Sequence, residues 1–361
     1  MKNIIAYVLC LIFLSNTLNA QTDSESSINP MNILFIGNSY THYNNMPSLF
    51  EKLAISKKYK INVEMNARSN HTFKMHSKRE DMYQAIRKTK WDYVVVQGFS
   101  RELMFSKERI DTASLPYFRQ IMDSIYSNNP CTNVLLYMTW GYENGYEGDN
   151  LVLTYQEMSD RIKAGYRYLA EMYQVPIVPV GDVWKNFRET YPSIRLYQED
   201  SQHPNLLGSY LIANTFYTSI FKNTPENGFV PAKIDTATAK KIQRLSFSSV
   251  STIIDTFKLN QNTMKFHFER NKKGEFIASG TANYPFADSL YWDLGNGIRI
   301  SNSNFRWKYS KSGTYLVKLI VYEKCGVREM YRRAIFKDPP QPRKKNNKPQ
   351  PAKPQKPVRK V

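Results

Sequence analysis

The stretch Asn32-Ile33-Leu34-Phe35-Ile36-Gly37-Asn38-Ser39-Tyr40-Thr41 lies near the start of the chain and decides its fold. It begins as a short apolar run that ends at a glycine, a pattern typical of a buried strand in a parallel sheet. Similar runs follow at residues 61–65, 92–97, 133–139 and 176–180. The sequence therefore predicts a buried strand at each of these places.

Segments of helical period separate these runs. After Ser114, a predicted N-cap, the apolar residues Phe118, Ile121, Met122 and Ile125 recur at the spacing of one helix face. Two further helices are expected within residues 153–173 and 208–221. Strands that alternate with helices indicate a parallel sheet covered on both faces, where ligands gather at the carboxyl ends of the strands. We assign residues 32–246 to this α/β domain.

The pattern changes from about Thr252 onward. Short segments with period-two alternation are separated by Gly, Asn and Ser turns, and no helical segment is expected among them. These segments lie at residues 265–269, 276–279, 290–293 and 314–322. We therefore predict a small all-β domain over residues 252–336.

The start of the chain has the pattern of a targeting signal. A basic residue at Lys2, an apolar run over residues 4–14 and a small residue at Ala20 are typical of a secretory signal peptide over residues 1–20. A polar leader follows at 21–31. The apolar run is too short to span a bilayer, and no other run reaches that length. We expect an exported protein (periplasmic, cell-surface or secreted) without a transmembrane segment.

The last 25 residues of the chain supply a large share of the formal net charge of +19. Residues 337–361 hold nine Lys or Arg, one acid and seven prolines, which gives a charge of 9 − 1 = +8. Such a composition predicts a disordered, extended arm. The arm could bind polyanions of any kind, whether glycan, lipid headgroup or nucleic acid, or it could be a solvated spacer. It does not indicate a specific nucleic-acid partner.

Removal of the signal would leave two cysteines, Cys131 and Cys325, in different predicted domains. Two cysteines do not make a disulfide framework, and we expect two independent thiols. Neither has the His or Cys neighbours of a zinc site, so no metal is implied.

Ser39 is the first candidate for chemistry because it directly follows a predicted buried strand and its glycine. A serine nucleophile needs a base, and the base needs a carboxylate that orients it. Of the five histidines, His203 has such a carboxylate three residues earlier, at Asp200. Pro204 then turns the chain into the next helix. The alternative is a capping serine and an exposed loop histidine; His42 has no carboxylate close in sequence.

The early strand-Gly-x-Ser block and the later Asp200-x-x-His203-Pro204 block resemble the SGNH/GDSL hydrolases, over about residues 32–221. The resemblance implies a three-layer, flavodoxin-like serine hydrolase that acts on esters. In it Ser39 would be the nucleophile, His203 the general base and Asp200 the residue that orients the base. Such enzymes need no metal or organic cofactor.

The oxyanion hole is where the sequence departs from that family. The resemblance implies three donors: the N–H of Ser39, a backbone N–H after the second strand and an amide side chain after the third. The second position has no glycine, but the N–H of Asn70 could serve because Asn tolerates positive φ. At the third position Gln97 stands in place of asparagine. We expect Ser39, Asn70 and Gln97 to bind the oxyanion, although Gln97 could instead cap a strand end.

Three other residues are weaker candidates. Trp140 follows a strand and could form a wall of the substrate site, or it could pack in the core. Asp182 also follows a strand and is expected to act as a cap. Glu199 neighbours Asp200 but lies one residue away from the spacing of the family.

The C-terminal unit resembles the PKD-type immunoglobulin-like sandwich in the stretch Tyr291-Trp292-Asp293-Leu294-Gly295-Asn296-Gly297 and in Ser312-Gly313-Thr314-Tyr315. Trp292 is its expected core residue. Such modules act as spacers or adhesion units, so no chemistry is assigned to it.

Together these features predict a secreted serine esterase whose substrate is a small-molecule ester or an O-acylated glycan. The alternative is a non-catalytic glycan-binding or adhesion protein that keeps the same fold. A surface protein that binds polyanions through its basic tail is a further alternative.

Overall fold

The computed structural model describes residues 30–260, 263–271, 273, 275–284, 287–323 and 326–337. The predicted signal peptide, nearly all of the leader and the basic tail beyond Lys337 lie outside the described residues. The chain divides into two compact units, with the boundary between Ile253 and Ile254.

The first unit is built on a parallel five-stranded sheet in the order β2-β1-β3-β4-β7. β1 lies at the second position, flanked by β2 and β3, so the segments that follow all three strands emerge side by side at one edge. The strands are β1 (Met31–Gly37), β2 (Ile61–Ala67), β3 (Tyr93–Val96), β4 (Asn133–Tyr137) and β7 (Ile177–Val178). The predicted parallel α/β sheet is confirmed.

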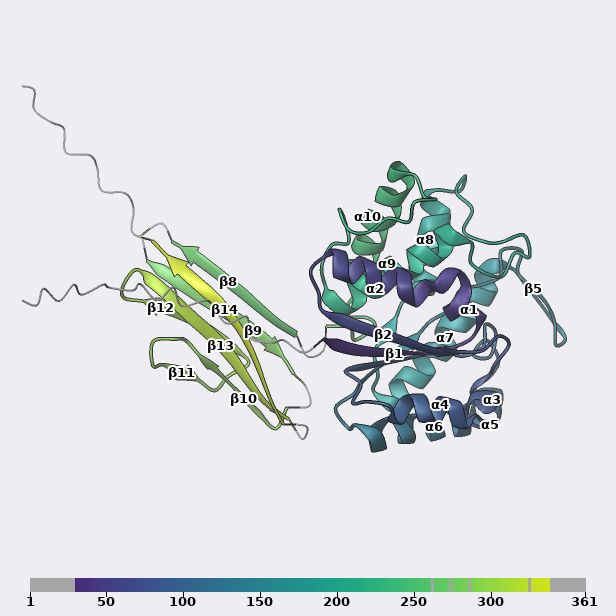
Figure 1. Cartoon of the computed structure of the whole chain (residues 1–361), viewed down its shortest axis with the longest axis horizontal. Helices are drawn as coiled ribbons and strands as arrows, with labels where there is room; N and C mark the ends of the chain where they lie inside the picture. Colours follow the sequence, from purple (N-terminus) through teal and green to yellow (C-terminus); the bar gives the residue numbers. More distant parts are fainter. Residues whose placement is uncertain are drawn as a thin grey trace, which may run out of the picture. The chain divides into compact units, whose positions relative to one another are not determined.

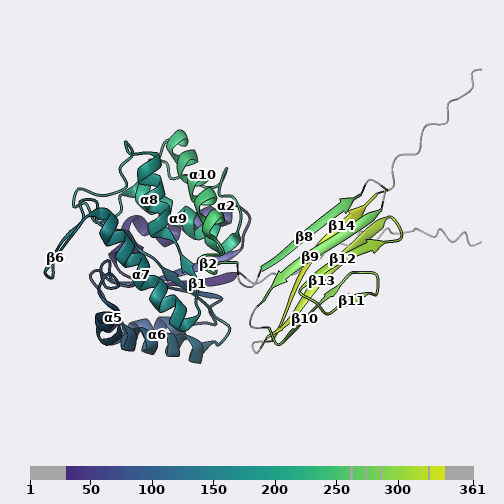
Figure 2. The same cartoon turned by 180° about the vertical axis from the view of Figure 1, so that it is seen from behind.

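Helices cover both faces of this sheet and make three layers, as Figures 1 and 2 show from opposite sides. One layer holds α2 (Met46–Ser56), α8 (Val180–Thr190), α9 (Leu206–Phe221) and α10 (Thr236–Ile253). The other holds α4 (Glu80–Arg87), α5 (Lys107–Ala113), α6 (Leu115–Asn128) and α7 (Tyr155–Tyr173). Shorter pieces are α1 (Ser39–His42), a 3₁₀ turn (Tyr43–Asn45), α3 (Phe73–His76) and the hairpin strands β5 (Tyr146–Gly148) and β6 (Leu151–Leu153).

The three helices predicted from apolar spacing are present as α6, α7 and α9. In α6, Phe118, Ile121, Met122 and Ile125 are all buried, as the spacing predicted. α7 begins at a capping box in which the Thr154 and Glu157 side chains each accept the other residue's backbone N–H. α9 is buried on nearly every side, because it packs against both α2 and α10 in the layer above the sheet.

The first unit ends later than the sequence predicted. We placed its end at Ser246, but α10 continues to Ile253. The Ser/Thr-rich end of this helix has low helix propensity, yet Ser246, Ser249 and Val250 are buried. Packing therefore overrides local preference here.

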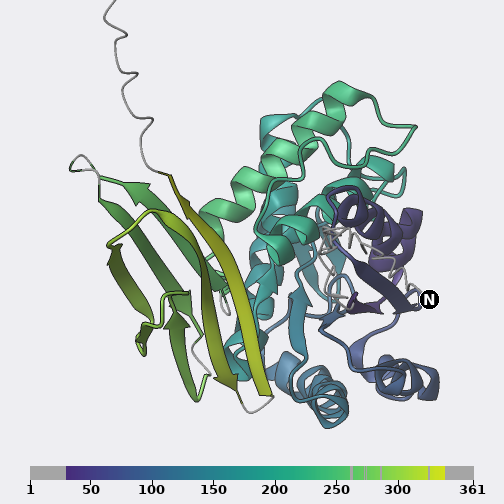
Figure 3. The same cartoon turned by 60° about the vertical axis from the view of Figure 1, so that its left-hand side comes forward.

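The second unit consists of antiparallel strands in two sheets around one apolar core, seen on edge in Figure 3. Trp292 is fully buried in this core, as expected. One sheet has the order β11-β10-β13-β14 and the other β12-β9-β8. The strands are β8 (Thr263–Arg270), β9 (Phe276–Asn283), β10 (Ser289–Asp293), β11 (Arg299–Ile300), β12 (Asn304–Tyr309), β13 (Gly313–Glu323) and β14 (Gly326–Phe336). Likeness to a PKD module stays a prediction.

Two further findings bear on the chain as a whole. Cys131 is disulfide-bonded, which corrects the expectation of two free thiols. The other cysteines, Cys10 and Cys325, lie outside the described residues. None of the helices in the described part of the chain is both long and apolar enough to cross a membrane.

Candidate active site

Ser39 lies at the carboxyl edge of the sheet, where β1 gives way to α1. Asn38 joins the two elements in an extended conformation, and its side-chain oxygen accepts the N–H of Tyr40 and so caps α1. The Ser39 side chain is 5% exposed. This short cap makes the chain turn sharply after the buried strand and brings the serine hydroxyl to the sheet edge.

The structure brings Ser39, His203 and Asp200 into one hydrogen-bonded chain. The Ser39 Oγ lies 2.9 Å from His203 Nε2, and His203 Nδ1 lies 2.5 Å from Asp200 Oδ2. Both distances are within the reach of a nucleophile, base and orienting carboxylate. With Nδ1–H donated to Asp200, Nε2 is free to accept the Ser39 hydroxyl proton.

The loop between α8 and α9 prepares Asp200 for this role. Its Oδ1 accepts the backbone N–H groups of Gln202 and His203 at 2.9 and 3.0 Å, which leaves Oδ2 for the imidazole. Burial by itself would raise the pKa of Asp200, but these N–H donors and the His203 ring outweigh it and hold the pKa below its usual value. The carboxylate therefore stays ionised beside the imidazole.

A second loop, after β4, holds the Asp200–His203 loop in place. The Glu143 N–H donates to the Ser201 carbonyl at 2.8 Å. The Arg195 guanidinium forms a bidentate pair with the Glu143 carboxylate, with Nη2 2.7 Å from Oε2 and Nε 3.2 Å from Oε1. The Trp140 Nε1–H donates to the Gln202 carbonyl at 3.2 Å.

These contacts correct the expectation that Trp140 forms a substrate wall. Its side chain has no exposed surface and is stacked between Tyr40 and Trp184, with ring centroids 4.3 and 4.1 Å away. Trp140 thus belongs to the core behind the loop that carries the histidine. The sequence placed it at the correct edge of the sheet but could not tell which way the ring points.

Gln97 does not have the donor role expected from its place after β3. It is fully buried, and its Nε2 hydrogens go to Asn38 Oδ1 at 2.8 Å and the Gly98 carbonyl at 2.7 Å. Its Oε1 accepts the Asn38 N–H at 3.1 Å and the Thr41 hydroxyl at 2.6 Å. With both amide hydrogens used, none remains for a substrate oxygen. Gln97 instead supports the turn that carries Ser39, through its hydrogen bonds to Asn38 and Thr41.

Gly37 makes room for this buried network. A Cβ at Gly37 would lie 2.3 Å from Thr41 Oγ1 and 2.6 Å from Gln97 Oε1, closer than real contacts allow. The glycine at the end of the strand is therefore required by packing around the nucleophile.

Asn70 lies in a tight turn after β2, with φ of 60°. The His71 N–H closes the turn onto the Arg68 carbonyl at 3.3 Å, and the Arg68 N–H donates to the Gly37 carbonyl at 3.0 Å. The left-handed conformation is the one in which asparagine replaces glycine at lowest cost. Within the described part of the chain, the backbone N–H groups of Ser39 and Asn70 have no acceptor.

Comparison with solved structures relates the first unit to known proteins. A DUF4886 family protein from Bacteroides uniformis is 19% identical, with a TM-score of 0.51, over 62% of this chain and 95% of that protein. The first unit has the fold of that protein. Other similar structures are a candidate SGNH hydrolase from Slackia heliotrinireducens and a variant of an acetylxylan esterase from Geobacillus stearothermophilus. The former is 25% identical (TM-score 0.41; 52% of this chain, 98% of that one) and the latter 18% identical (TM-score 0.38; 52% and 92%). Neither a protein-family model nor a curated protein matches the chain.

Two residues that sequence reasoning missed join the serine and histidine segments. Asn44 donates from its side chain to the Pro204 carbonyl at 3.1 Å and to the Ser209 hydroxyl at 2.9 Å. The Tyr43 ring stacks on the His203 imidazole, with centroids 4.4 Å apart. The sequence signal for these contacts was the Asn44-Asn45 pair, because Asn pairs are frequent in turns. In the structure both residues are left-handed.

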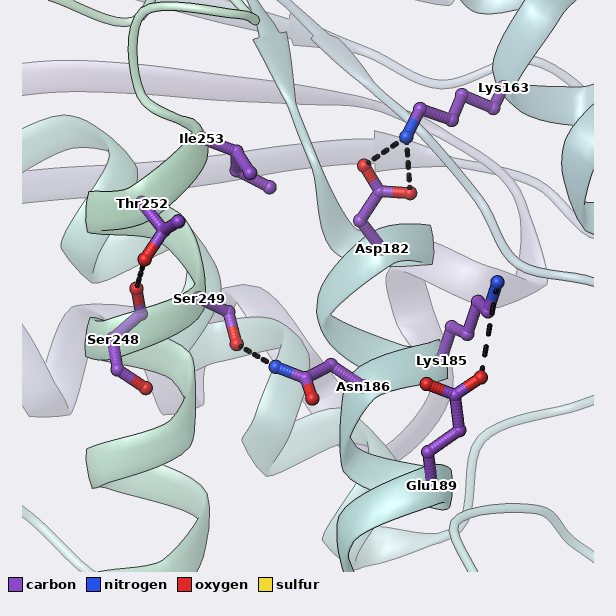
Figure 4. A pocket seen from close by; sticks show the side chains of 9 residues that line it. All are labelled: Lys163, Asp182, Lys185, Asn186, Glu189, Ser248, Ser249, Thr252 and Ile253. Atoms are coloured by element: carbon purple, nitrogen blue, oxygen red, sulfur yellow. Dashed lines mark hydrogen bonds and ion pairs between the residues drawn. The ribbon is translucent and has the colours of Figure 1, made fainter.

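The remaining candidates have partners other than Ser39. His42 contacts the Ser69 hydroxyl at 2.8 Å, and burial, followed by the neighbouring His203, lowers its pKa. Asp182 forms an ion pair with Lys163 at 2.9 Å on one side of an open pocket between α8 and α10 (Figure 4). Of the other polar side chains drawn there, Asn186 donates to the Ser249 hydroxyl and Lys185 pairs with Glu189, whereas the Thr252 hydroxyl donates to a backbone carbonyl of α10. Among the described residues, no group of three His, Cys, Asp or Glu is arranged to hold a metal.

Proposed function

We propose that this protein is an exported serine esterase of the SGNH type. The observation that carries the proposal is the continuous hydrogen-bonded chain from the Ser39 hydroxyl through His203 to Asp200. A capping serine and an exposed loop histidine would have no reason to meet across 164 residues of chain. A buried hydroxyl whose hydrogen-bond partner is an oriented imidazole is the arrangement that nucleophilic catalysis requires.

The geometry supports a two-step reaction. His203 Nε2 takes the Ser39 proton as Oγ attacks the ester carbonyl carbon, and the carbonyl π electrons move onto oxygen. The intermediate collapses, the C–O bond to the alcohol breaks, and the imidazolium returns its proton to the leaving alkoxide. Water then attacks the acyl-serine with His203 again as base, which releases the acid and regenerates Ser39. Asp200 stays ionised and stabilises the imidazolium.

The oxyanion would be bound by backbone rather than side-chain groups. We assign the N–H of Ser39 and the N–H of Asn70 to this role, because both lack acceptors among the described residues. The third donor expected from Gln97 is not included. Each lost donor costs about 2.7–4 kcal/mol of transition-state stabilisation, so a hole with two donors would favour activated esters over amides.

The proposal also covers the class of substrate and the location of the protein. The predicted signal peptide and the disulfide at Cys131 both favour an oxidising compartment outside the cytoplasm. An exported esterase joined to a β unit of adhesion type would act on a glycan that carries O-acyl groups, such as acetylated xylan. Release of acetate from acetylated xylan, compared with release from p-nitrophenyl acetate, would test the glycan separately from the chemistry.

Hydrolysis of p-nitrophenyl acetate by the wild type and by Ser39→Ala tests the enzyme itself. The proposal expects turnover by the wild type and at least a ~10³-fold loss in the variant. Equal slow turnover by both would favour the alternative, a non-catalytic glycan-binding protein on the same scaffold. The loss of Gln97 as a donor is the one observation that favours that alternative.

A further inference from the structure

One half-buried carboxylate near the site, Glu102, takes no part in the mechanism above. Glu102 lies in the segment between β3 and α5. Its Oε2 accepts the Phe99 N–H at 3.0 Å, and its two oxygens accept the Phe73 N–H at 3.1 and 3.2 Å. Phe73 begins α3, directly after the turn that contains Asn70, whereas Phe99 belongs to the segment after β3.

The carboxylate thus joins the two segments on either side of the nucleophile. Asn38 joins the same segments a few residues earlier, because its Nδ2 donates to the His71 carbonyl at 3.3 Å and to the Gly98 carbonyl at 3.2 Å. One clamp is a neutral amide next to Ser39, and the other is the Glu102 carboxylate. Together they hold the turn from Arg68 to His71 at a fixed distance from β1.

The contact made by Glu102 lowers the stability of the fold. Within the described residues no Lys or Arg pairs with it, and burial raises its pKa to about 7 despite the N–H donors of Phe99 and Phe73 and the Ser114 hydroxyl. A half-buried charge without a cation lowers stability, and a neutral side chain would lower it less. A group that costs stability beside a candidate site indicates a functional role.

We propose that Glu102 is a positioning residue of the esterase, whose carboxylate fixes Phe73 and thereby holds the Asn70 N–H in place to receive the oxyanion. This inference rests on the proposed function. It makes the oxyanion hole depend on a group that does not touch the substrate.

The ionised form makes the clamp, because a carboxylate accepts from both N–H groups while a carboxylic acid must place a hydrogen toward one of them. The elements packed around Glu102 present few other titrating groups. The Tyr166 phenol of α7 faces it and is kept neutral by burial, Ser114 from the start of α6 does not titrate, and Arg101 on the same segment lies over the Phe99 ring. Glu102 therefore titrates by itself around neutral pH.

Glu102→Gln mimics the protonated acid with little change in shape, and its kinetics test the proposal. With p-nitrophenyl acetate at pH 8.5 we expect kcat to fall about tenfold or more with KM almost unchanged. At pH 5.5, where Glu102 of the wild type is itself protonated, the ratio of the two kcat values should fall below about twofold. Both proteins carry the same Ser39, His203 and Asp200, so any pH dependence that the two proteins share cancels in the ratio. A ratio that is the same at both pH values, or equal kcat at pH 8.5, would overturn the proposal.

Amide hydrogen exchange gives a second readout that does not depend on activity. Exchange in residues 68–73 should be faster in Glu102→Gln and in Glu102→Ala than in the wild type at pH 8.5, whereas Asp182→Asn, a carboxylate at the same sheet edge, should leave exchange there and kcat unchanged. Unchanged exchange in both Glu102 variants would contradict the clamp. A wild type that hydrolyses no ester but shows the exchange difference would refute the proposed function and leave the clamp standing.

Discussion

At the scale of single residues, the proposed activity depends on the Asp200 carboxylate, which binds both its own loop and His203. Asp200 uses one oxygen for two backbone N–H groups of its own loop and the other for the imidazole. The loop thereby fixes both the position of the carboxylate and the tautomer of His203. Removing the Asp200 charge should leave the positions of the loop and of His203 largely unchanged, while the His203 imidazolium loses its stabilisation.

Asp200→Asn is predicted to lower kcat with p-nitrophenyl acetate by roughly 10²–10⁴-fold. Glu199→Gln is the matched control, because it removes a neighbouring carboxylate that makes no contact with His203, and its activity should stay within about twofold of the wild type. Steady-state kinetics of the two variants measures the difference. Similar losses in both would mean that net charge on the loop, and not the Asp200–His203 contact, governs activity.

Gln97 is a second single residue with a testable role, but its substitution should act on stability. Gln97→Leu would leave the Thr41 hydroxyl and both the N–H and Oδ1 of Asn38 without their buried partner. The expected loss is about 2–4 kcal/mol in the free energy of unfolding, together with reduced activity. Urea denaturation measures the loss, and Gln156→Leu on the exposed face of α7 should change stability by less than about 0.5 kcal/mol. A Gln97 variant as stable as the wild type would show that the network contributes nothing.

At the scale of elements, the sequence predicted where side chains lie along the chain better than where they point. The strand before Ser39 and the Asp200–His203 spacing predicted three neighbouring residues at the sheet edge, where the structure has them joined by hydrogen bonds. Gln97 and Trp140 also lie at strand ends, yet each turns inward, because their donors find buried partners in Asn38 and Gln202. Chemistry and register are local properties, whereas orientation at a strand end depends on packing from distant segments.

The short helix α3 shows the same dependence on packing. His76 at its end has no exposed surface, and the Arg79 guanidinium donates to its Nδ1 at 3.1 Å. Burial first, and then the Arg79 charge, lowers the pKa of His76 to about 3. Nothing in the sequence distinguished this histidine from the exposed ones.

His76 therefore predicts acid sensitivity. Its pKa in the folded protein is below the ordinary value of 6.5, so the unfolded chain binds the extra proton. The free energy of unfolding should be highest above pH 6.5 and fall by up to about 1.4 kcal/mol per pH unit on the way to pH 4. Denaturation curves of His76→Gln should show a smaller slope, while His267→Gln, on the exposed surface of β8, should keep the wild-type slope. Equal slopes in all three proteins would rule out His76 as the cause.

At the scale of the whole molecule, the proposed chemistry lies entirely in the first unit. The second unit has its own core around Trp292, and the basic tail follows its last strand. The alternation of apolar and polar residues predicted the β unit because it needs no tertiary information, whereas the extended basic tail stays a prediction. The end of the first unit was misplaced because the Ser/Thr-rich turns of α10 form a helix only against their neighbours.

Deleting residues 338–361 tests the tail. The truncated protein should elute from heparin at lower salt, because eight of the nine tail Lys and Arg are removed. Its kcat and KM for p-nitrophenyl acetate should stay at the wild-type values. Unchanged elution would assign the tail to the role of a solvated spacer, and a loss of activity would tie it to the site.

The central claim is that a single serine is activated by a histidine far along the chain. Labelling with a fluorophosphonate, followed by intact-mass and peptide mass spectrometry, tests it most directly. We predict one adduct, mapped to Ser39, whose formation is at least ~100-fold slower in His203→Ala. No adduct, an adduct on another serine, or the same labelling rate in the histidine variant would contradict the account.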